Sequence, residues 1–282
     1  MPDVPDAKDD AVEPAASGVR EVKSALRTMD VLEFLGTRAG EPARLREITS
    51  ALDAPRSSTY ALLRTLVSRG WVTTDISGNF YSLGIRALLV GTSYLDADPY
   101  LRVVRPVLTQ VAEALDETVH MARLDGPDVV YLATQESHQY LRANSRVGRR
   151  LPAHATSLGK AILAERDLAD VPLVLSAVTA HTIVDRDALL ADLAGVRRRG
   201  YAIDDEENSI GLRCFGLPLR YSSPVTDALS CSVPLARLTA KREQEIVMAL
   251  SAARQQIEAA APLQPRISQL APIPRRPRSL TS

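Results

Sequence analysis

The sequence of 282 residues has little of three features that would each mark a class of protein: cysteine, charge of one sign, and long apolar runs. Its two cysteines, Cys214 and Cys231, are too few for a disulfide framework or a cysteine-rich zinc cluster. The 34 Lys+Arg balance the 34 Asp+Glu, which excludes a uniformly basic or acidic protein. Because 45% of the residues are apolar, ordinary globular cores are expected, and the length predicts about two domains.

No apolar run approaches the roughly 20 residues that cross a bilayer. The N-terminal stretch MPDVPDAKDDAVEPAASGVR is acidic and lacks the basic and apolar regions of a secretory signal. We therefore expect a soluble, cytoplasmic protein with no membrane partner. The histidines (His120, His138, His154 and His181) lack compact metal-ligand spacing and no phosphate-binding glycine loop is present, so no metal or cofactor is assigned.

The balanced total conceals an uneven distribution of charge. Residues 1–19 carry one basic and five acidic side chains, whereas residues 20–90 carry ten basic and seven acidic ones. Residues 91–261 carry 19 basic and 22 acidic side chains, and residues 262–282 carry four basic and no acidic ones. The head over 1–19 and the proline-rich tail over 262–282 lack an apolar period, so both are predicted to be disordered. The basic tail leaves a contact with phosphates open.

Residues 20–84 follow the pattern of a small DNA-binding module. After a first amphipathic helical pattern, a short helix is expected over 45–52 and a third over 56–69. Two segments rich in β-formers, 71–74 and 80–83, flank a Ser-Gly turn and predict a hairpin. Three helices followed by a hairpin form a winged helix-turn-helix.

The last helix of such a module presents small and cationic side chains to the major groove of DNA. Pro55 suits the entrance to this helix, and Ser57 or Ser58 is expected to cap exposed amides or to donate to a phosphate. Arginine binds guanine or neutralises phosphate, whereas hydroxyls mostly position the helix on the DNA backbone. The residues expected to face DNA are Arg56, Ser57, Ser58, Tyr60 and Arg64. From spacing alone, a helical bundle with these residues on its solvated face remains an alternative.

The rest of the chain predicts a helical connector over 85–117, broken at Asp98-Pro99, and then an α+β domain over 118–261. Strands are expected at 119–124, 129–134, 201–203, 212–221 and 226–233, and helices at 157–165, 185–199 and 239–260. This mixed order favours helices packed against a largely antiparallel sheet.

Six strings in order resemble the IclR family of bacterial transcriptional regulators over residues 22–261. They are LREITSALDAPRSSTYALLRTLVSRGWV, SGNFYSLG, ETVHMARLDGPDVVYL, SRVGRRLPAHATSLGKAIL, VRRRGYAIDDEENSIGLRC and ALSCSVPLARLT. The resemblance implies an N-terminal winged helix, a helical linker and a C-terminal GAF-like domain that binds a small, often carboxylate-bearing metabolite. It also implies homodimers or dimers of dimers that repress or activate catabolic operons.

The chain departs from the family pattern within the DNA-reading module. Asp53 stands where the family often has glycine, and Ala61 stands where a basic residue is common. The wing tip over 77–80 lacks the cation that many members place there. Phosphate neutralisation is therefore expected to come from Arg64, Arg69 and Arg86.

By the resemblance, the effector pocket forms where the LPAHATSLGKA, DDEE with GLRC, and ALSCS strings meet. The residues that this transfer assigns to the effector are Ser157, Leu158, Asp204, Cys214, Ser230 and Ser232. A buried carboxylate needs donors around it, and the amides of Ser157 and Leu158 begin a predicted helix whose positive end would supply them. Some acid-binding members carry small residues at these two positions, so the hydroxyl and the branched apolar side chain here favour a larger or less polar ligand, such as an aromatic acid or a related aromatic compound.

Several interpretations stay open. Cys214 also fits a small buried hydrophobe, His154 a structural residue, and Lys160 an ion-pair partner within the fold. An enzyme is a second class, because Cys214, His154 and Asp204 are the residue types of a thiol hydrolase; no nucleophile signature accompanies them, so no catalytic residue is assigned. A DNA-binding scaffold whose C-terminal domain only dimerises is a third class.

The combined prediction is a ligand-responsive regulator, more specifically a repressor of a catabolic operon. Its expected partners are double-stranded operator DNA, a small organic effector and further copies of itself. Saturable binding of a small metabolite would separate this regulator from a scaffold.

Overall fold

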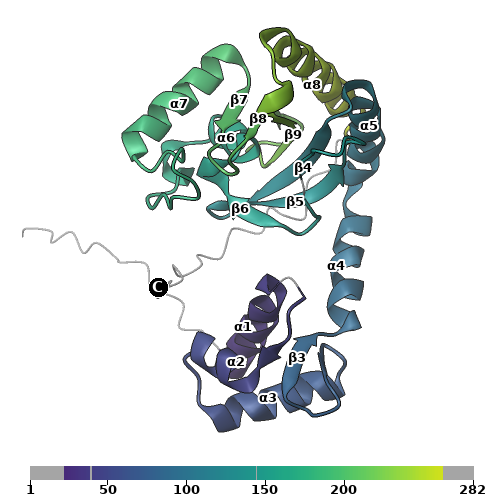
Figure 1. The fold of residues 1–282 in the computed structure, drawn as a ribbon, viewed down its shortest axis with the longest axis vertical. Coiled ribbons are helices and arrows are strands. Elements are labelled where there is room, and N and C mark those ends of the chain that lie inside the picture. Colours follow the sequence, from purple (N-terminus) through teal and green to yellow (C-terminus); the bar gives the residue numbers. More distant parts are fainter. Residues whose placement is uncertain (1–21, 39, 144, 263–282) are drawn as a thin grey trace, which may run out of the picture. The chain divides into compact units, whose positions relative to one another are not determined.

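The computed structural model describes residues 22–38, 40–143 and 145–262 of the chain. The chain divides into two compact units, of which the first ends at Ser93 and the second begins at Tyr94 (Figure 1). The predicted head over 1–19 lies outside the described residues, as does the predicted tail beyond residue 262. No helix within the described ranges is long and apolar enough to cross a membrane.

The first unit is a winged helix-turn-helix, as predicted. Its elements are α1 (Lys23–Thr37), β1 (Ala43–Arg44), α2 (Leu45–Ala51), α3 (Arg56–Ser68), β2 (Val72–Thr74) and β3 (Phe80–Leu83). The strands form an antiparallel sheet in the order β1-β3-β2. The apolar stripes of the three helices meet in one core that includes Val31, Ile48 and Leu63. Strand β1 has two residues, too few for a sequence period to reveal it.

The turn between α2 and α3 differs in detail from the expectation. Pro55 stands at the N-cap position of α3, and no side chain caps the helix. The expected capping role of Ser57 or Ser58 is therefore wrong: the Ser58 hydroxyl donates instead to the Pro55 carbonyl at 3.0 Å. Asp53 has a φ of 44°, a left-handed conformation that glycine adopts at least cost. This conformation accounts for the glycine that the resemblance associates with this position.

The second unit is built on a six-stranded antiparallel sheet in the order β6-β5-β4-β9-β8-β7. Its strands are β4 (Thr118–Asp125), β5 (Asp128–Gln135), β6 (Arg150–Pro152), β7 (Ala202–Asp205), β8 (Leu212–Leu219) and β9 (Asp227–Pro234). Its helices are α5 (Pro99–Leu115), α6 (Ser157–Leu163), α7 (Arg186–Arg199) and α8 (Ala240–Ala260). The expected α+β class is confirmed, and each predicted strand and helix is present with shifted ends.

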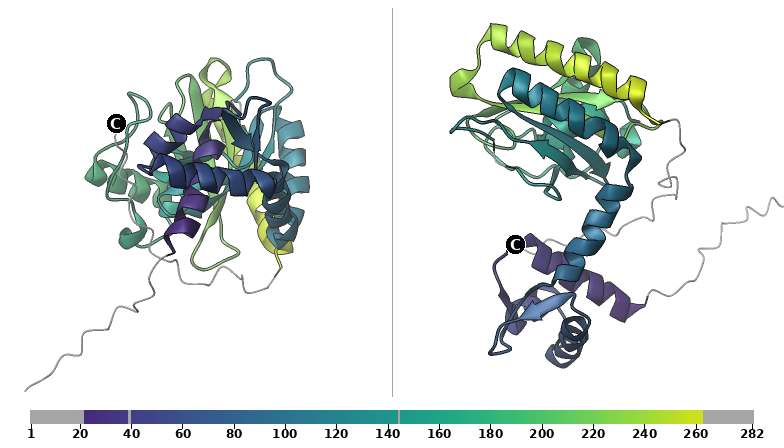
Figure 2. Two further views of the ribbon diagram at one scale, coloured as in Figure 1. Left: turned by 90° about the horizontal axis from the view of Figure 1, so that it is seen from below. Right: turned by 90° about the vertical axis from the view of Figure 1, so that its right-hand side faces the viewer.

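Helices cover both faces of this sheet (Figures 1 and 2). On one face α5 and α8 pack side by side over alternate strand residues, among them Met121, Phe215 and Cys231. On the other face α6 and α7 pack over the intervening residues, including Ala122 and Ala228. The period of two in a strand sends successive side chains to opposite faces, so each strand contributes to both layers.

The predicted connector over 85–117 consists of two helices in different surroundings. Helix α4 (Ile85–Ala97) has no buried residue, whereas α5 buries a stripe in the core of the second unit. They are separated by Asp98, whose carboxylate accepts hydrogen bonds from the amides of Tyr100 and Leu101 and so caps α5. The predicted break at Asp98-Pro99 is confirmed.

Candidate functional site

Strand pairing in the second unit brings polar residues into one patch. Directly paired residues of antiparallel strands project to the same face. Asp204 of β7 pairs with Cys214 of β8, which pairs in turn with Ser232 of β9. Two residues earlier on β9, Ser230 pairs with His120 of β4. These five polar side chains therefore lie on the face of the sheet that α6 covers.

Helix α6 lies close to this face because Gly216 of the sheet has no side chain, and it lies equally close to the 3-10 turn Ala153–Ala155 because Gly159 has none. A Cβ on Gly216 of β8 would lie 2.6 Å from the carbonyl carbon of Ser157, and one on Gly159 would lie 2.5 Å from the carbonyl carbon of Ala153. The Thr156 hydroxyl accepts a hydrogen bond from the Gly159 amide at 3.0 Å and caps the helix. The start of α6 is thus held directly over the polar patch.

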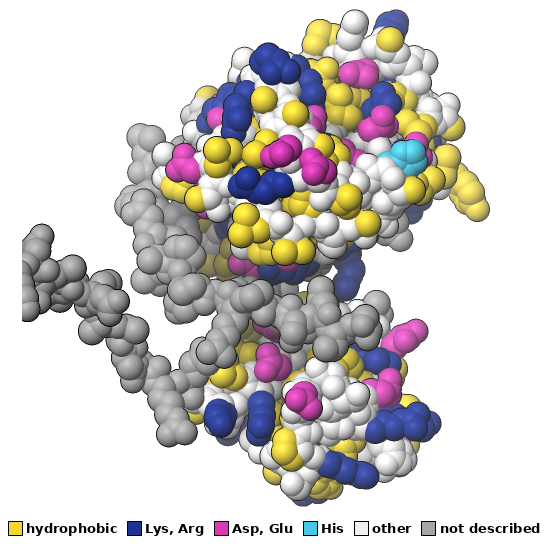
Figure 3. All heavy atoms as spheres, turned by 90° about the vertical axis from the view of Figure 1, so that its left-hand side faces the viewer, with side chains coloured by type: hydrophobic (Ala, Val, Ile, Leu, Met, Phe, Trp, Pro, Cys, Tyr) yellow, Lys and Arg dark blue, Asp and Glu magenta, His cyan; other side chains and the backbone are white. Residues whose placement is uncertain are grey.

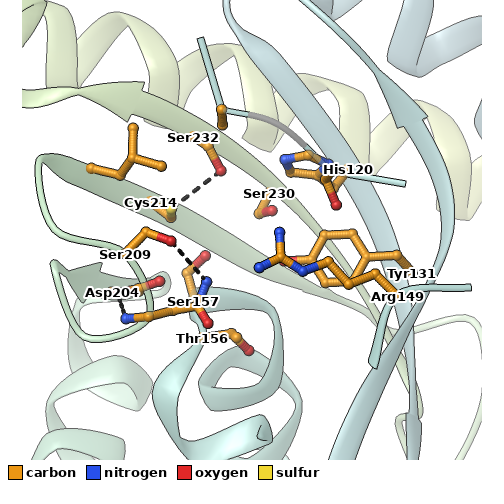
Figure 4. A pocket seen from close by; sticks show the side chains of 14 residues that line it. His120, Tyr131, Arg149, Thr156, Ser157, Asp204, Ser209, Cys214, Ser230 and Ser232 are labelled. Carbon is orange, nitrogen blue, oxygen red and sulfur yellow. Dashed lines mark hydrogen bonds between the residues drawn. The ribbon is translucent and has the colours of Figure 1, made fainter. Parts of the chain in front are cut away.

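A cavity lies between the polar patch and the start of α6 (Figure 4). Five of the six residues predicted to bind the effector line it: Ser157, Asp204, Cys214, Ser230 and Ser232. The sixth, Leu158, is not among them and is 1% exposed within the core beneath α6 and α7. Because successive residues of a helix are turned by about 100°, Leu158 points away from its neighbour and into the core.

Sequence reasoning missed several residues that line the same cavity: His120, Tyr131, Arg149, Asn208 and Ser209. All of them lie in or beside the strings that carried the family resemblance. These residues lie on β4 and β5 or in the loops that follow β5 and β7. Only the order of the strands in the sheet shows that these segments meet at one cavity.

Burial determines the protonation of His120. This side chain is 2% exposed, and its Nδ1 atom lies 3.2 Å from the Thr134 hydroxyl. Burial foremost, and then the positive charge of Arg149, lower the pKa of His120 to about 3. The imidazole is therefore neutral at physiological pH and supplies a hydrogen bond without a charge.

Burial has the opposite effect on the acidic groups of the cavity. It raises the pKa of Asp204 to about 7, although the carboxylate accepts hydrogen bonds from the amides of Glu207 and Asn208 at 2.8 and 3.2 Å. Burial also raises the pKa of the Cys214 thiol well above its ordinary value, and the thiol donates to the Ser232 hydroxyl at 3.1 Å. A protonated thiol is a poor nucleophile.

Two other candidates from the sequence have structural partners. The Lys160 ammonium is 1% exposed and lies 2.5 Å from Glu207 Oε1 and 2.9 Å from Asp192 Oδ2. His154 is also buried, and its Nε2 atom lies 3.0 Å from the Ser176 carbonyl oxygen. Neither residue is among those that line the cavity. Lys160 therefore serves the fold as an ion-pair partner, and His154 as a hydrogen-bonded core residue.

In the first unit, the predicted DNA-facing residues share one surface of α3. Arg56, Ser57, Ser58, Tyr60 and Arg64 are all exposed, whereas Thr59, Leu63 and Leu66 face the core. Figure 3 shows Lys and Arg side chains on the face of this unit that is turned to the viewer. The helix therefore offers cations and hydroxyls to a partner.

The turn of the wing is held by one carboxylate. Asp75 accepts hydrogen bonds from the amides of Asn79 and Phe80, both at 2.9 Å, and from the amide and hydroxyl of Ser77. These bonds, that of the Ser77 hydroxyl foremost, lower the pKa of Asp75 to about 2. Ile76 at the tip is fully exposed. Residues 75–80 thus include the Asp75 carboxylate but no lysine or arginine that could contact phosphate.

Arg123 joins the sheet of the second unit to the end of α4. Its Nε and Nη2 atoms donate to the two carboxylate oxygens of Asp227, each at 2.9 Å, and Arg123 and Asp227 are directly paired on β4 and β9. The same guanidinium donates to the Tyr94 hydroxyl at 2.9 Å and contacts the Asp98 carboxylate. The last turn of α4 is therefore fastened to the sheet by a partly buried ion-pair network.

Family models match both units of the chain. A model described as the IclR helix-turn-helix domain matches residues 24–75, and one described as bacterial transcriptional regulator IclR C-terminal matches residues 92–259. The chain belongs to the IclR family. It is accordingly a DNA-binding transcriptional regulator with a C-terminal ligand-binding domain.

Curated relatives of this IclR-family chain agree over most of its length. The transcriptional repressor IclR of Escherichia coli is 33% identical over 250 residues, covering 85% of this chain and 90% of the relative. The regulator KdgR of the same species is 32% identical over 244 residues, covering 84% and 92%. Both are named as regulators of transcription, which argues against the hydrolase alternative.

Solved structures show the same fold. The IclR regulator of Alicyclobacillus acidocaldarius has a TM-score of 0.76 at 24% identity, covering 85% of this chain and 99% of its own. An IclR homolog of Microbacterium hydrocarbonoxydans, solved in complex with 4-hydroxybenzoate, has a TM-score of 0.69 at 24% identity, covering 84% and 100%.

Proposed function

We propose that this IclR-family chain represses a catabolic operon and that a small organic acid or aromatic compound, bound in the cavity of the second unit, controls its affinity for operator DNA. The observation that carries the proposal is a buried cavity lined by polar side chains in a chain that also presents an exposed cationic helix. The naming of the E. coli IclR and Salmonella acetate operon relatives as repressors supports repression. The 4-hydroxybenzoate of the Microbacterium homolog supports an aromatic acid as one class of effector.

The DNA-binding part of the proposal rests on α3. Arg56 and Arg64 bind guanine edges or phosphates in the major groove, and the hydroxyls of Ser57, Ser58 and Tyr60 position the helix on the DNA backbone. Residues 20–90 carry ten basic and seven acidic side chains, a small surplus for a protein whose affinity rests on phosphate neutralisation. Two or more copies are therefore needed for tight binding.

Self-association is supported by α4. Ile85, Leu88, Leu89 and Val90 are between 58% and 66% exposed, and the first three lie at the i, i+3, i+4 spacing of one helix face. A contiguous apolar stripe of this kind is typical of an interface. We propose that a second copy of the chain covers it, so that two winged helices read two half-sites of a palindromic operator.

Regulation requires that the effector bind one arrangement of the dimer more tightly than the other, typically by about 1–3 kcal/mol. Helix α4 is the covalent connection between the units, and Arg123 binds its last turn through Tyr94. Effector binding in the second unit would act on the DNA-reading units through this helix.

Fluorescence anisotropy with DNA from upstream of the chain's own gene and of neighbouring genes tests the proposal. Arg56→Ala and Arg64→Ala are each expected to weaken specific binding roughly 5- to 150-fold, the equivalent of about 1–3 kcal/mol. Lys241→Ala removes an exposed cation of α8 in the second unit and serves as the control that binds normally. Wild-type affinity in both α3 variants would refute the assignment of the recognition helix.

Self-association has its own test. Sedimentation velocity should show a dimer or a larger assembly for the wild-type chain and a shift toward monomer for a Leu88→Gln, Leu89→Gln variant. An unchanged sedimentation coefficient in that variant would contradict the proposed α4 interface. For the cavity, an effector response that survives substitution of Ser157, Asp204 and Ser230 would place the effector elsewhere.

A further inference from the structure

Among the described residues that line the cavity, Arg149 is the single lysine or arginine. It immediately precedes β6, and its backbone is fixed against β5. The Tyr131 amide donates to the Arg149 carbonyl at 2.9 Å, and the Gly148 amide donates to the Tyr131 carbonyl at 2.8 Å. The sheet itself therefore sets the position of Arg149.

The direction of the Arg149 side chain follows from its neighbour. Adjacent residues of an extended chain point to opposite sides. Arg150 is pinned away from the cavity by two carboxylates, those of Asp125 and Asp128, the latter 2.6 Å from its Nε atom. Arg149 accordingly points inward, and Figure 4 shows its guanidinium beside Tyr131. His120 lines the same cavity, and the charge of Arg149 contributes, after burial, to lowering the pKa of His120.

Three hydroxyls face the same cavity from different elements. They belong to Tyr131 of β5, Ser157 of α6 and Ser230 of β9, which are 7%, 2% and 1% exposed. None of the three makes a hydrogen bond within the described part of the chain. Two further lining groups, the Ser145 hydroxyl and the Asn208 Oδ1 atom, are buried without a hydrogen-bond partner among the described residues. Leaving a buried polar group unpaired costs about 1–3 kcal/mol, so this lining favours a ligand with several polar atoms.

The two sides of the cavity differ in charge. Arg149 and Tyr131 lie on one side in Figure 4, and Asp204 lies on the other with Ser209 and Ser157 near it. Asp204 is the one carboxylic acid among the described lining residues, and burial disfavours its charged form. The cavity thus combines a fixed cation at one side with a polar, weakly charged group at the other.

We propose that Arg149 selects the effector by charge: it binds a carboxylate of the effector between the hydroxyls of Tyr131 and Ser230, while Asp204 hydrogen-bonds a hydroxyl of the same molecule. The effector class is then a small hydroxy acid, and neutral or amino compounds of the same shape are rejected. This inference rests on the proposed function, because it specifies the chemistry of the same cavity.

Calorimetry on the full-length chain tests the class with two matched sets of probes. One set is propionate, lactate and lactamide, and the other is benzoate, 4-hydroxybenzoate and 4-hydroxybenzamide. In the set that fits the cavity, the hydroxy acid is expected to bind more tightly than the plain acid. The hydroxy amide is expected to bind at least tenfold more weakly than the hydroxy acid, because a charge-assisted hydrogen bond is about twice as strong as a neutral one. An amide that binds as tightly as its acid would overturn the proposal, as would no binding of either hydroxy acid at millimolar concentration.

A variant pair then assigns the selection to Arg149. Arg149→Gln is expected to weaken binding of the hydroxy acid roughly tenfold or more while leaving binding of the amide unchanged. Arg150→Gln is the matched control: it removes the adjacent guanidinium, which points away from the cavity, and should bind the acid normally. Equal loss of acid and amide binding in Arg149→Gln would show a merely structural role and overturn the proposal.

Anisotropy without any effector separates this inference from the proposed function. If the wild-type chain fails to bind DNA but binds the hydroxy acid in an Arg149-dependent way, the proposed function fails and the charge selection stands. If the chain and its Arg149→Gln variant both bind DNA while the acid preference is absent from both, only the inference fails.

Discussion

The close approach of α6 to β8 yields a sharp prediction, because it depends on the absence of one side chain. Replacing Gly216 by alanine puts a Cβ atom 2.6 Å from the carbonyl carbon of Ser157 and 3.1 Å from the Leu158 nitrogen. The Ser157 carbonyl oxygen is closer still, so α6 and β8 must separate by about 1 Å to reach ordinary contact near 3.4 Å, and all three obstructing atoms are backbone. Inserting atoms into a packed core costs typically 1–3 kcal/mol, and a backbone obstruction places this substitution at the upper end of that range.

The free energy of unfolding of the second unit should therefore fall by about 2–3 kcal/mol in Gly216→Ala, which lowers its melting temperature by roughly 4–10 °C. Far-UV circular dichroism follows this unit, which holds most of the described residues. Trp71 is the only tryptophan of the chain and lies in the first unit, so its fluorescence reports that unit separately and should melt as in the wild type. Displacement of Ser157 should also weaken effector binding.

Gly195→Ala is the matched control. Gly195 lies inside α7, and the nearest atom to an added Cβ is the flexible tip of Arg199 at 3.2 Å. Alanine is favoured over glycine within a helix by about 0.5–1 kcal/mol, so this variant should be as stable as the wild type or slightly more stable. A Gly216→Ala variant that melts and binds effector like the wild type would refute the packing argument.

Three further predictions concern other parts of the molecule. Asp53→Gly should stabilise the first unit by about 0.5–1 kcal/mol, because glycine adopts the left-handed backbone at φ 44° without strain. Trp71 fluorescence in urea measures this gain, and a destabilised variant would contradict the account. The same variant should bind DNA more tightly, because it removes an anion near α3. The affinity of the cavity for an acidic effector should decrease as the pH rises through about 7, because Asp204 then acquires a negative charge that repels the effector. Calorimetry at pH 6 and pH 8 should show this dependence for the wild-type chain and should show none for Asp204→Asn. Lys160→Met should lower the free energy of unfolding of the second unit by about 3–5 kcal/mol, because the carboxylates of Glu207 and Asp192 lose their buried cation. Adding Glu207→Gln should restore part of this stability in chemical denaturation, and no restoration would refute the ion-pair explanation.

The sequence predicted the winged helix-turn-helix well because its helices are amphipathic and its hairpin has a turn signal at Ser77-Gly78. It also predicted five cavity residues through the family strings. Leu158 was included with Ser157 because the resemblance supplies positions, whereas the helical rotation between adjacent residues decides which of them faces the cavity.

Arg149 could not be found in the same way. In the sequence it stands beside Arg150, and a pair of arginines is typical of a solvated surface. Only strand β6, too short for a period of its own, shows that the two side chains point to opposite sides. Similarly, the sequence predicts the break of the connector at Asp98-Pro99 but not the different surroundings of its two halves, which only the packing of α5 against α8 reveals.

The pairing of β4 with β9 has a mechanical consequence. The rung formed by His120 and Ser230 lies at the cavity, and the rung formed by Arg123 and Asp227 lies three residues along the same two strands, a span of about 10 Å. Both residue pairs belong to the same hydrogen-bonded pairing of β4 with β9, so we expect a displacement of one pair to be passed to the other. In the proposed regulation, an effector that displaces the first pair would shift the second, and with it the hydroxyl of Tyr94 in the last turn of α4. The proposed sensing and transmission thus involve residue pairs that lie three positions apart on a single pair of strands.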